Sequence, residues 1–425
     1  MFGRRRMFVK KVAELDYTQL KNNCFPDEFS FKTTADLEAW KGIIGQERAV
    51  KAFDFGLAVK MKGYNIYMAG PSGTGKTTYA RYSAEKIAAT ESVPQDWCYV
   101  YNFQDPKKPI AISFEAGNGK YFKKDMEELV AIFKKELQKA FLSDEFEKQK
   151  GKIVHSIQEQ QDILVGKMSA MAAEQDFQLK KTASGVCFLP IVNGEPFEEE
   201  NYASLSEEQI KLIEAKTQYI QEKVTGFMRE MNELEKACDI QVEELEHKVG
   251  VSAIGHYVSD FLEKYQSSDL IKTYILAVEE DVLDNLDKFV ETEESEEEEL
   301  STLLPLLNRK PEEDIMQRYG VNLLIDHSET KGAPVVVTFN PTYTNLMGEI
   351  EYDSEFGNLT TDFMKIKAGL FHQANGGYLI VQAQDILTIP HAWEALRRVI
   401  KTKEIDMDSI RELLGITAAP TLKPD

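Results

Sequence analysis

One stretch of the chain combines glycines, a lysine and a threonine at the spacing that proteins use to hold phosphate groups. Residues 70–77 read GPSGTGKT, which satisfies the pattern G-x-x-x-x-G-K-[ST] at every fixed position. The glycines let the backbone curl until its N–H groups face phosphate oxygens. Lys76 supplies an ammonium group for the β- and γ-phosphates, and Thr77 supplies a hydroxyl for Mg²⁺. The stretch therefore predicts a site for a nucleoside triphosphate with its magnesium ion.

The flanks of this loop match the structural context that the motif requires. Residues 65–69 form a short apolar run that favours a strand, and residues 78–89 are rich in helix formers. This order places the start of a helix, with its partial positive charge, beside the phosphates. A glycine turn that merely connects a strand to a helix is the alternative. The residues predicted to contact the nucleotide are Gly70, Pro71, Ser72, Gly73, Thr74, Gly75, Lys76, Thr77 and Thr78, and Lys76 is also a predicted catalytic residue.

The composition is that of an acidic globular protein. The chain has 425 residues, a formal net charge of −21 and a pI near 4.9. Binding to nucleic-acid backbones relies on clustered Lys and Arg, so this balance argues against a nucleic-acid partner. No apolar run approaches the roughly 20 residues of a membrane span, and the N-terminus has no signal-peptide core. The cysteines form no CxxC pair, which favours free thiols and a cytoplasmic location.

The middle of the chain is predicted to be helical. From about Lys120, apolar residues fall three or four positions apart, which is the spacing of long amphipathic helices. The pattern breaks at residues 184–197, where Asn193-Gly194 between apolar runs predicts a tight β-hairpin. Ser206 begins a capping box that predicts another helix, which runs to about Val249. Helices of this length project from a compact core or pair as an antiparallel coil.

Short strands are predicted on both sides of this helical region. The predicted strands lie at residues 98–103, 321–326, 335–339 and 376–381, and further helices lie within residues 42–63 and near residues 393–400. The sequence GGYLIV at residues 376–381 is typical of a strand buried in a parallel sheet. We therefore predict an α/β fold, a P-loop core with a parallel sheet that is interrupted by a long α-helical, coiled-coil-like insertion.

Five segments, in this order, resemble one protein family. They read GIIGQERAVKAFDFG, GYNIYMAGPSGTGKTT, CYVYNFQDPKKP, NPTYTNLMGEIEY and TDFMKIKAGLFHQANGGYLI. Together they are similar to the AAA+ ATPase part of bacterial Lon-like (Lon-related) ATP-dependent proteases with a helical insertion. In that family the AAA+ module binds ATP, assembles into a ring and feeds unfolded protein to a C-terminal serine protease domain. The resemblance thus implies ATP and Mg²⁺ as cofactors.

The resemblance also implies further site residues and a division of the chain. Ile44, Gly45 and Gln46 are implied to lie near the adenine, with a helix N-terminus packed against the core as the equal alternative. The implied domains are an N-terminal lead-in at 1–41, the first half of the AAA+ core at 42–119, the helical insertion at 120–300 and the second half of the core at 301–425. The sensor, lid and protease regions of the family are expected to lie outside this chain.

One predicted strand departs from the pattern of the family. Relatives place Asp and Glu where Gln382 and Ala383 stand, and neither of these side chains organises Mg²⁺ or activates water as a carboxylate does. Asp385 is the nearest acid and is the candidate catalytic replacement, with capping of the following turn as the equal alternative. The sequence therefore predicts nucleotide binding and leaves ATP hydrolysis open.

Two further features suggest contacts with a substrate and with a neighbouring subunit. Residues 345–369 resemble a hairpin that pushes substrates through the pore of ring ATPases, with Phe356 as an aromatic paddle at its tip. Ordinary hairpin packing is the alternative. Arg397 and Arg398 follow the last predicted strand and are candidates to touch a neighbour's γ-phosphate, against a solvated helix face as the favoured alternative.

The function that fits these features is the ATP-binding, substrate-handling module of a Lon-like ATP-dependent protease. The expected partners are unfolded or tagged protein substrates, further copies of the chain in a ring, and a Lon-type protease domain in a longer chain or a separate polypeptide. No membrane partner is expected. One alternative is a nucleotide-gated scaffold that binds ATP without efficient hydrolysis and holds a partner protein through its helices. Another is a DNA-repair ATPase, against which the acidic balance argues.

Overall fold

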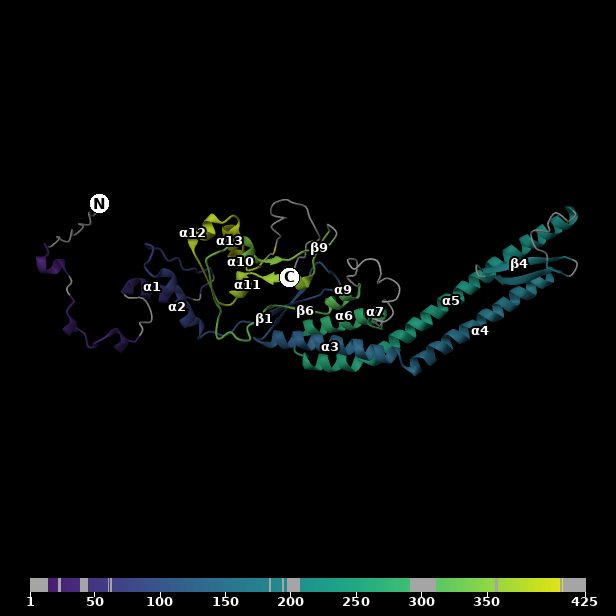
Figure 1. Cartoon of the computed structure of the whole chain (residues 1–425), viewed down its shortest axis with the longest axis horizontal. Coiled ribbons are helices and arrows are strands. Elements are labelled where there is room, and N and C mark those ends of the chain that lie inside the picture. The colour runs from purple at the N-terminus through teal and green to yellow at the C-terminus, as the bar shows by residue number, and fades with distance from the viewer. Residues whose placement is uncertain are drawn as a thin grey trace, which may run out of the picture. The chain divides into compact units, whose positions relative to one another are not determined.

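The computed structural model describes residues 14–21, 24–38, 45–59, 61, 63–182, 185–192, 195–196, 207–290, 311–355, 358–405 and 407. Its contacts group the chain into two units, unit 1 (Met1–Ala84) and unit 2 (Glu85–Asp425). The protein is mixed α/β, with long helices and several small sheets (Figure 1). None of the described helices is both long and apolar enough to cross a membrane. The boundaries of the four domains drawn from the sequence stay predictions.

Unit 1 contains helix α1 and most of helix α2. The elements are the short 3₁₀ turns η1 (Tyr17–Leu20), η2 (Pro26–Glu28) and η3 (Thr34–Asp36), then α1 (Glu47–Ala58) and α2 (Lys76–Ala88), whose last turn belongs to unit 2. The helix predicted within residues 42–63 is confirmed as α1. Phe53 and Leu57 are buried on its inner face. Met61 lies beyond the end of the helix and is exposed.

The strand predicted at residues 65–69 is wrong for the described structure. These residues pair with no strand in any of the described sheets, and the Tyr67 side chain is 78% exposed. Ile66 lies against α1, since a Cβ placed on Gly56 would be 3.1 Å from Ile66 Cδ1. A strand needs a hydrogen-bonded neighbour as well as an apolar sequence, because its backbone N–H and C=O groups must be paired. The apolar sequence alone does not supply that neighbour.

Unit 2 contains an antiparallel sheet and a separate parallel pair of strands. β1 (Asp96–Val100) lies between β2 (Ile110–Phe114) and β6 (Val321–Ile325) and is antiparallel to both. β7 (Val335–Thr338) and β12 (Tyr378–Val381) pair in parallel, with Tyr378 opposite Val335. The strands predicted from residues 98, 321, 335 and 376 onward are confirmed. Among the described strands, the parallel arrangement holds only for β7 and β12. The short connection from β1 to β2 allows just an antiparallel turn.

The helical insertion begins with a bundle, here called the root, that shares its hydrophobic core with this antiparallel sheet. The root consists of α3 (Asn118–Phe141), the last part of α5 (Glu207–Lys264), α6 (Asp269–Asp284) and α7 (Leu286–Val290). Fully buried side chains from all these helices and from β1 meet there, among them Val100, Phe122, Phe133, Ile254, Val278 and Phe289. Burial of so many large apolar side chains is the main stabilising contribution to the root.

A buried carboxylate fixes the root to the sheet. Asp96 begins β1 and is 0% exposed. Its Oδ2 accepts hydrogen bonds from the backbone N–H groups of Gly117 (2.7 Å) and Gly119 (3.0 Å), and its Oδ1 accepts one from the N–H of His327 (2.8 Å). Three chain segments that are distant in sequence therefore meet at one side chain.

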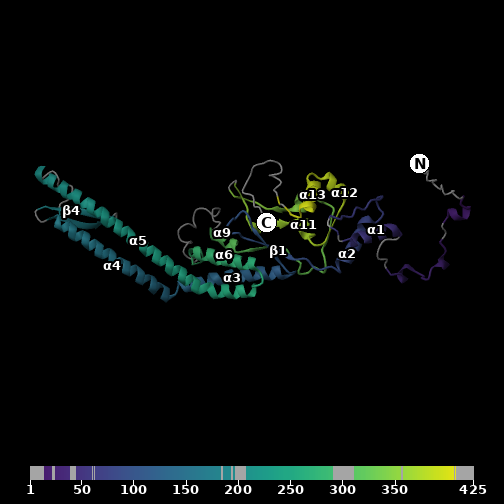
Figure 2. The same cartoon turned by 180° about the vertical axis from the view of Figure 1, so that it is seen from behind.

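Two helices extend from the root as a pair, here called the arm. α4 (Asp144–Glu174) runs along α5, and β3 (Phe177–Thr182), β4 (Gly185–Val192) and β5 (Glu195–Pro196) lie against them at the end away from α3 (Figures 1 and 2). Lys150 pairs with Glu246 at 3.1 Å, and Lys216 pairs with Asp176 at 2.6 Å, so the two helices are antiparallel. β4 pairs with β5 across Asn193-Gly194, which lies outside the described residues, as the hairpin prediction required.

Helix α5 is longer than predicted. It contains 58 residues and would span roughly 87 Å, whereas the sequence placed its end near Val249. Gly250 lies inside the helix and does not end it. The glycine lets α5 pack closely on α6, since a Cβ there would be 2.8 Å from Leu283 Cδ2. Ser206, proposed as the capping residue, and the acidic block at residues 291–299 lie outside the described residues.

The remainder of unit 2 consists of short elements. They are α9 (Pro311–Arg318), α10 (Tyr343–Met347), β8 (Gly348–Ile350), β9 (Asp353–Glu355), β10 (Asn358–Thr360), η6 (Phe363–Lys365), β11 (Ile366–Ala368), α11 (Leu370–Gln373), α12 (Ala383–Thr388) and α13 (Ala392–Thr402). α13 confirms the last predicted helix. It buries Ala392 and Ala395, whereas Trp393 and Ile400 are exposed.

Candidate nucleotide-binding site

The loop at residues 70–77 has the curled backbone that its sequence predicts. Gly73 and Gly75 have φ angles of 79° and 78°, in the left-handed region that glycine adopts without steric cost. Thr74 stabilises the turn, because its Oγ1 donates to the carbonyl oxygen of Pro71 at 2.9 Å. Two such residues separated by one other change the direction of the chain just before α2. The loop can thus present successive backbone N–H groups toward one point.

Lys76 is the first residue of α2, and its ammonium group is held inside the curve of the loop. Nζ donates to the carbonyl oxygens of Gly70 (3.0 Å) and Pro71 (2.6 Å). An ammonium group has three N–H donors, so a further one is available for an anion. The first N–H groups of an α-helix have no acceptor within the helix, which adds donors at the same end. These residues therefore fit a phosphate group.

Helix α1 packs against the first turns of α2. The Tyr79 hydroxyl donates to Asp54 Oδ1 at 3.1 Å, and the Tyr79 and Phe53 rings lie 5.5 Å apart. Burial raises the pKa of Tyr79, with Asp54 adding to the effect, so the hydroxyl stays neutral and remains a donor. The Tyr79 N–H donates to the Gly75 carbonyl at 2.9 Å. These contacts fix the first turn of α2, which includes Thr77 and Thr78.

The residues implied to lie near the adenine stand at the beginning of α1. Gly45 and Gln46 have φ angles of 76° and 58°, and the Gln46 carbonyl accepts from the N–H groups of Ala49 and Val50 at 2.9 and 3.0 Å. Both residues therefore turn the chain into the helix. Ile44 lies outside the described residues. A contact with adenine stays a prediction for all three.

The hairpin predicted at residues 345–369 is present in unit 2 as two nested strand pairs. β8 pairs with β11, and within this frame β9 pairs with β10, both antiparallel. Phe356, which the sequence predicts at the tip, lies outside the described residues, as does Gly357. A paddle role for Phe356 therefore stays a prediction.

The segment that replaces the expected acids follows β12. Gln382 precedes helix α12, and Ala383 begins it. Asp385 is half-buried in the first turn, where its backbone carbonyl accepts from the Ile389 N–H at 3.0 Å. Asp385 thus takes part in the turn through its backbone. A metal or catalytic role for its carboxyl group stays a prediction, and the phosphate loop belongs to unit 1 whereas this segment belongs to unit 2.

Two protein families match parts of this chain. The LonB-like AAA domain matches residues 331–425, which include β7, the nested hairpin and β12. The Lon-like LonC helical domain matches residues 96–129, which include β1, β2 and the first half of α3. The chain is a Lon-related AAA+ protein. No curated protein matches the chain closely enough to count as a relative.

The phosphate loop of this Lon-related AAA+ protein lies outside both matched ranges. Membership of an AAA family implies nucleotide binding in general. The assignment of the nucleotide to residues 70–77 rests instead on the loop's own sequence and on the contacts of Lys76. The family match and the loop are therefore two independent reasons to expect a nucleotide.

The two arginines of α13 differ in their surroundings. Arg397 is exposed, as the alternative of a solvated helix face expects. Arg398 is half-buried, and its Nη2 donates to the Tyr343 hydroxyl of α10 at 3.3 Å. In this Lon-related protein Arg398 therefore ties α13 to α10. A contact of Arg397 with a neighbour's γ-phosphate stays a prediction.

Two polar residues beside the nested hairpin were not predicted from the sequence. His372 Nδ1 accepts from the Gly369 N–H at 3.1 Å, and burial lowers the pKa of His372 to about 4, so the ring stays neutral and can accept. Asn322 in β6 donates from Nδ2 to the carbonyls of Phe363 (2.8 Å) and Ile366 (2.9 Å). An asparagine inside the apolar run VNLLI was the available signal, because a polar side chain in a strand of the core needs a partner.

Proposed function

We propose that the chain is the ATP-binding, substrate-handling module of a Lon-like ATP-dependent protease. The observation that carries this proposal is the phosphate loop, with positive φ at Gly73 and Gly75 and with Lys76 inside its curve. The match to Lon-related families supplies the context in which a nucleotide drives the handling of a polypeptide. In this role the chain assembles with further copies of itself and acts together with a Lon-type protease domain.

Each part of the loop has a separate task toward the nucleotide. The N–H groups of the loop and of the first turn of α2 hold phosphate oxygens. Lys76 neutralises charge on the β- and γ-phosphates, and Thr77 provides a hydroxyl for Mg²⁺. When bound, the magnesium ion would offset the negative charge of the phosphate groups. Residues 44–46 lie on the adenine side in this proposal.

The polypeptide is handled by the nested hairpin in this proposal. The sequence places an aromatic side chain, Phe356, between β9 and β10, and an aromatic ring grips many sequences because it is large and rigid. Binding of the nucleotide ties neighbouring subunits together and changes the position of such loops. The proposal therefore couples the occupancy of residues 70–77 to the grip on a substrate.

The proposal is tested first by the titration of ATP and magnesium into the purified chain. We expect saturable binding that Lys76→Ala weakens by about tenfold or more, since a hydrogen bond to a charged group contributes roughly 1.5–3 kcal/mol. Lys86→Ala is the matched control, because Lys86 is an exposed lysine in the last turn of the same helix. Folded protein that shows no saturable binding, or equal binding by both variants, contradicts the proposal.

A second candidate function is a nucleotide-gated scaffold that binds ATP without turning it over. The observation that favours it is the segment after β12, where Gln382 and Ala383 supply no carboxylate. Release of phosphate from ATP distinguishes the two functions. Phosphate release is measured with Lys76→Ala and Asp385→Asn. Release that requires both residues supports an ATPase in which Asp385 binds the metal ion or activates the attacking water. Binding of ATP with no release dependent on Lys76 supports the scaffold.

A further inference from the structure

The inner hairpin of unit 2 is too short to hold its own orientation. β9 and β10 pair through three residue pairs, Asn358 with Glu355, Leu359 with Ser354 and Thr360 with Asp353. A two-stranded hairpin is at best marginally stable by itself in water. A hairpin that pushes or grips another chain must resist force, so its base has to be fastened to something larger.

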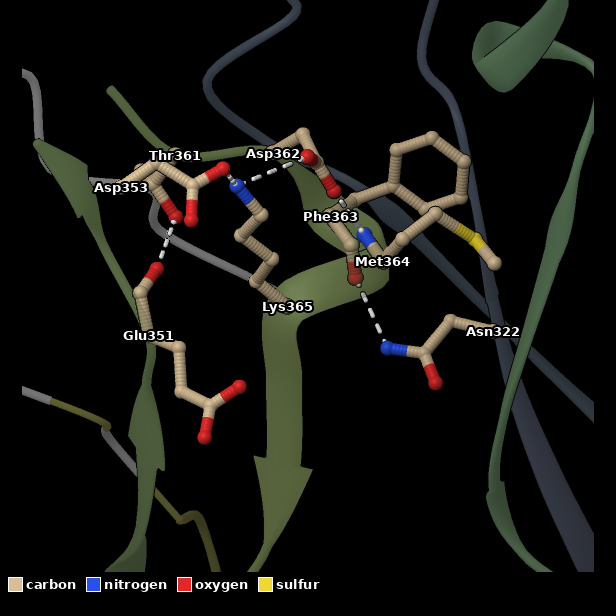
Figure 3. Close-up of polar contacts among 8 residues, drawn as sticks. All are labelled: Asn322, Glu351, Asp353, Thr361, Asp362, Phe363, Met364 and Lys365. Carbon is tan, nitrogen blue, oxygen red and sulfur yellow. Dashed lines mark hydrogen bonds and ion pairs between the residues drawn. The ribbon is translucent and has the colours of Figure 1, made fainter. Parts of the chain in front are cut away.

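Lys365 fastens the two strands of this hairpin to each other. Its ammonium group forms an ion pair with Asp353, the first residue of β9, and a second with Asp362, two residues beyond β10, at 3.7 Å (Figure 3). The Lys365 side chain is 19% exposed, against 42% for Asp353 and 31% for Asp362, so water screens the ammonium group less than it screens one on the surface. Both legs of the hairpin are therefore held by one cation.

The same residue is fixed to the antiparallel sheet through its neighbours. Asn322 of β6 donates to the carbonyls of Phe363 and Ile366, which flank Lys365 on either side (Figure 3 shows the bond to Phe363). The Lys365 carbonyl also accepts from the Glu351 N–H at 3.1 Å, at the entry to the hairpin. The backbone around Lys365 is thus fixed to the sheet, whereas its ammonium group contacts the hairpin.

We propose that Lys365 is a positioning residue for the polypeptide, which sets the direction of the β9–β10 hairpin relative to the β2–β1–β6 sheet. The inference rests on the proposed function, in which this hairpin contacts an unfolded chain. Lys365 does not touch that chain. It keeps the hairpin at the angle at which the chain is gripped, and loss of its charge lets the hairpin swing.

The test measures binding of a permanently unfolded polypeptide, fluorescein-labelled reduced and carboxymethylated lactalbumin, by fluorescence anisotropy with and without ATP and magnesium. We expect Lys365→Met to weaken binding about fivefold and Lys365→Arg to restore it to within about twofold, since a partly buried ion pair is worth an effect of this size. Lys367→Met is the matched control, because Lys367 pairs with Glu351 while 57% exposed. It should also stay within about twofold of the unchanged protein.

Hydrogen exchange separates positioning from a general loss of structure. In Lys365→Met we expect faster exchange at the amides of residues 353–362 and unchanged exchange in α3 and β1. If Lys365→Met does not fold, Asp353→Asn removes the same ion pair through its carboxylate and should weaken binding of the polypeptide in the same way. Equal polypeptide binding by the unchanged protein and Lys365→Met overturns the inference.

The failure of the inference and the failure of the proposed function give different results. Unchanged protein that binds ATP but no lactalbumin, with or without nucleotide, overturns the role of Lys365 and leaves nucleotide binding in place. Protein that binds no ATP contradicts the proposed function, whereas the comparison of Lys365→Met with Lys367→Met in the absence of nucleotide still decides the role of Lys365.

Discussion

The phosphate loop and the root of the helical insertion depend on glycines for opposite reasons. At Gly73 in the loop the backbone needs a positive φ of 79°, and a Cβ would meet nothing within 4 Å. At Gly119 in the root no unusual φ is involved, but a Cβ would lie 2.9 Å from Leu323 Cδ1 and 3.0 Å from Asp96 Cβ. The loop is thus determined by its backbone angles and remains open to a ligand. The root is determined by packing and has no room for an added methyl group at Gly119.

The largest expected effect belongs to the root and concerns Asp96. Its replacement in Asp96→Ala leaves the N–H groups of the buried Gly119 and His327, and of the half-buried Gly117, without their acceptor. Since each unsatisfied buried donor costs about 1–3 kcal/mol, we expect the free energy of unfolding to fall by roughly 3–5 kcal/mol. Urea denaturation followed by far-UV circular dichroism measures it.

Asp326→Ala is the control for this prediction. Asp326 is exposed, and its Oδ1 accepts from the N–H of Ser328, two residues away, at 2.8 Å. We expect a change within about 0.5 kcal/mol, as for surface residues in general. A loss for Asp96→Ala no greater than for Asp326→Ala would show that packing alone holds the root to the sheet.

This contrast also explains how much of the molecule its sequence could predict. The nucleotide loop was found because all its determinants lie within eight adjacent residues, from Gly70 to Thr77. Asp96 was missed because its partners lie 21, 23 and 231 residues away. Nothing in the local sequence distinguishes such a carboxylate from an exposed one, so only the fold identifies it.

The same reasoning applies to the strands and to the contacts that hold the β9–β10 hairpin. GGYLIV at residues 376–381 predicted the strand β12 correctly, because it is apolar and a partner strand, β7, is available. The run at residues 65–69 is equally apolar, yet it has no partner among the described strands. Pairing is a long-range property, as is the contact of Asn322 with a carbonyl 41 residues away. The helices and strands were therefore easier to predict than the segments that each of them contacts.

The next largest effect sharpens the comparison between the two kinds of glycine. In Gly119→Ala the new methyl group must displace Leu323 and also Asp96, which three hydrogen bonds hold in place. We expect a loss of about 1–3 kcal/mol in the free energy of unfolding, the usual cost of overpacking. Gly226→Ala is the control, because Gly226 is exposed in α5 and a Cβ there meets nothing within 4 Å.

The control should change stability in the opposite direction. Alanine is the better helix former, so Gly226→Ala should raise the free energy of unfolding by about 0.5–1 kcal/mol. Denaturation of both variants under the same conditions gives the two values side by side. A destabilised Gly226→Ala would mean that the arm packs against something else, and an unchanged Gly119→Ala would mean that the root can relax around a methyl group.

The smallest effect on stability is expected in the loop, at Gly73. Alanine has enough space there, but an L-residue in the left-handed region costs about 1–2 kcal/mol, which the loop can relieve by changing its curve. The midpoint of thermal unfolding should therefore move little, whereas affinity for ATP falls, because the N–H groups no longer point at one place. Gly73→Asn discriminates between angle and space, since asparagine tolerates positive φ better than alanine while it is larger. If Gly73→Asn binds ATP better than Gly73→Ala, the backbone angle is the requirement at this position. The reverse order would mean that space near the phosphates matters more. Glycine would then be needed in the loop for the same reason as in the root.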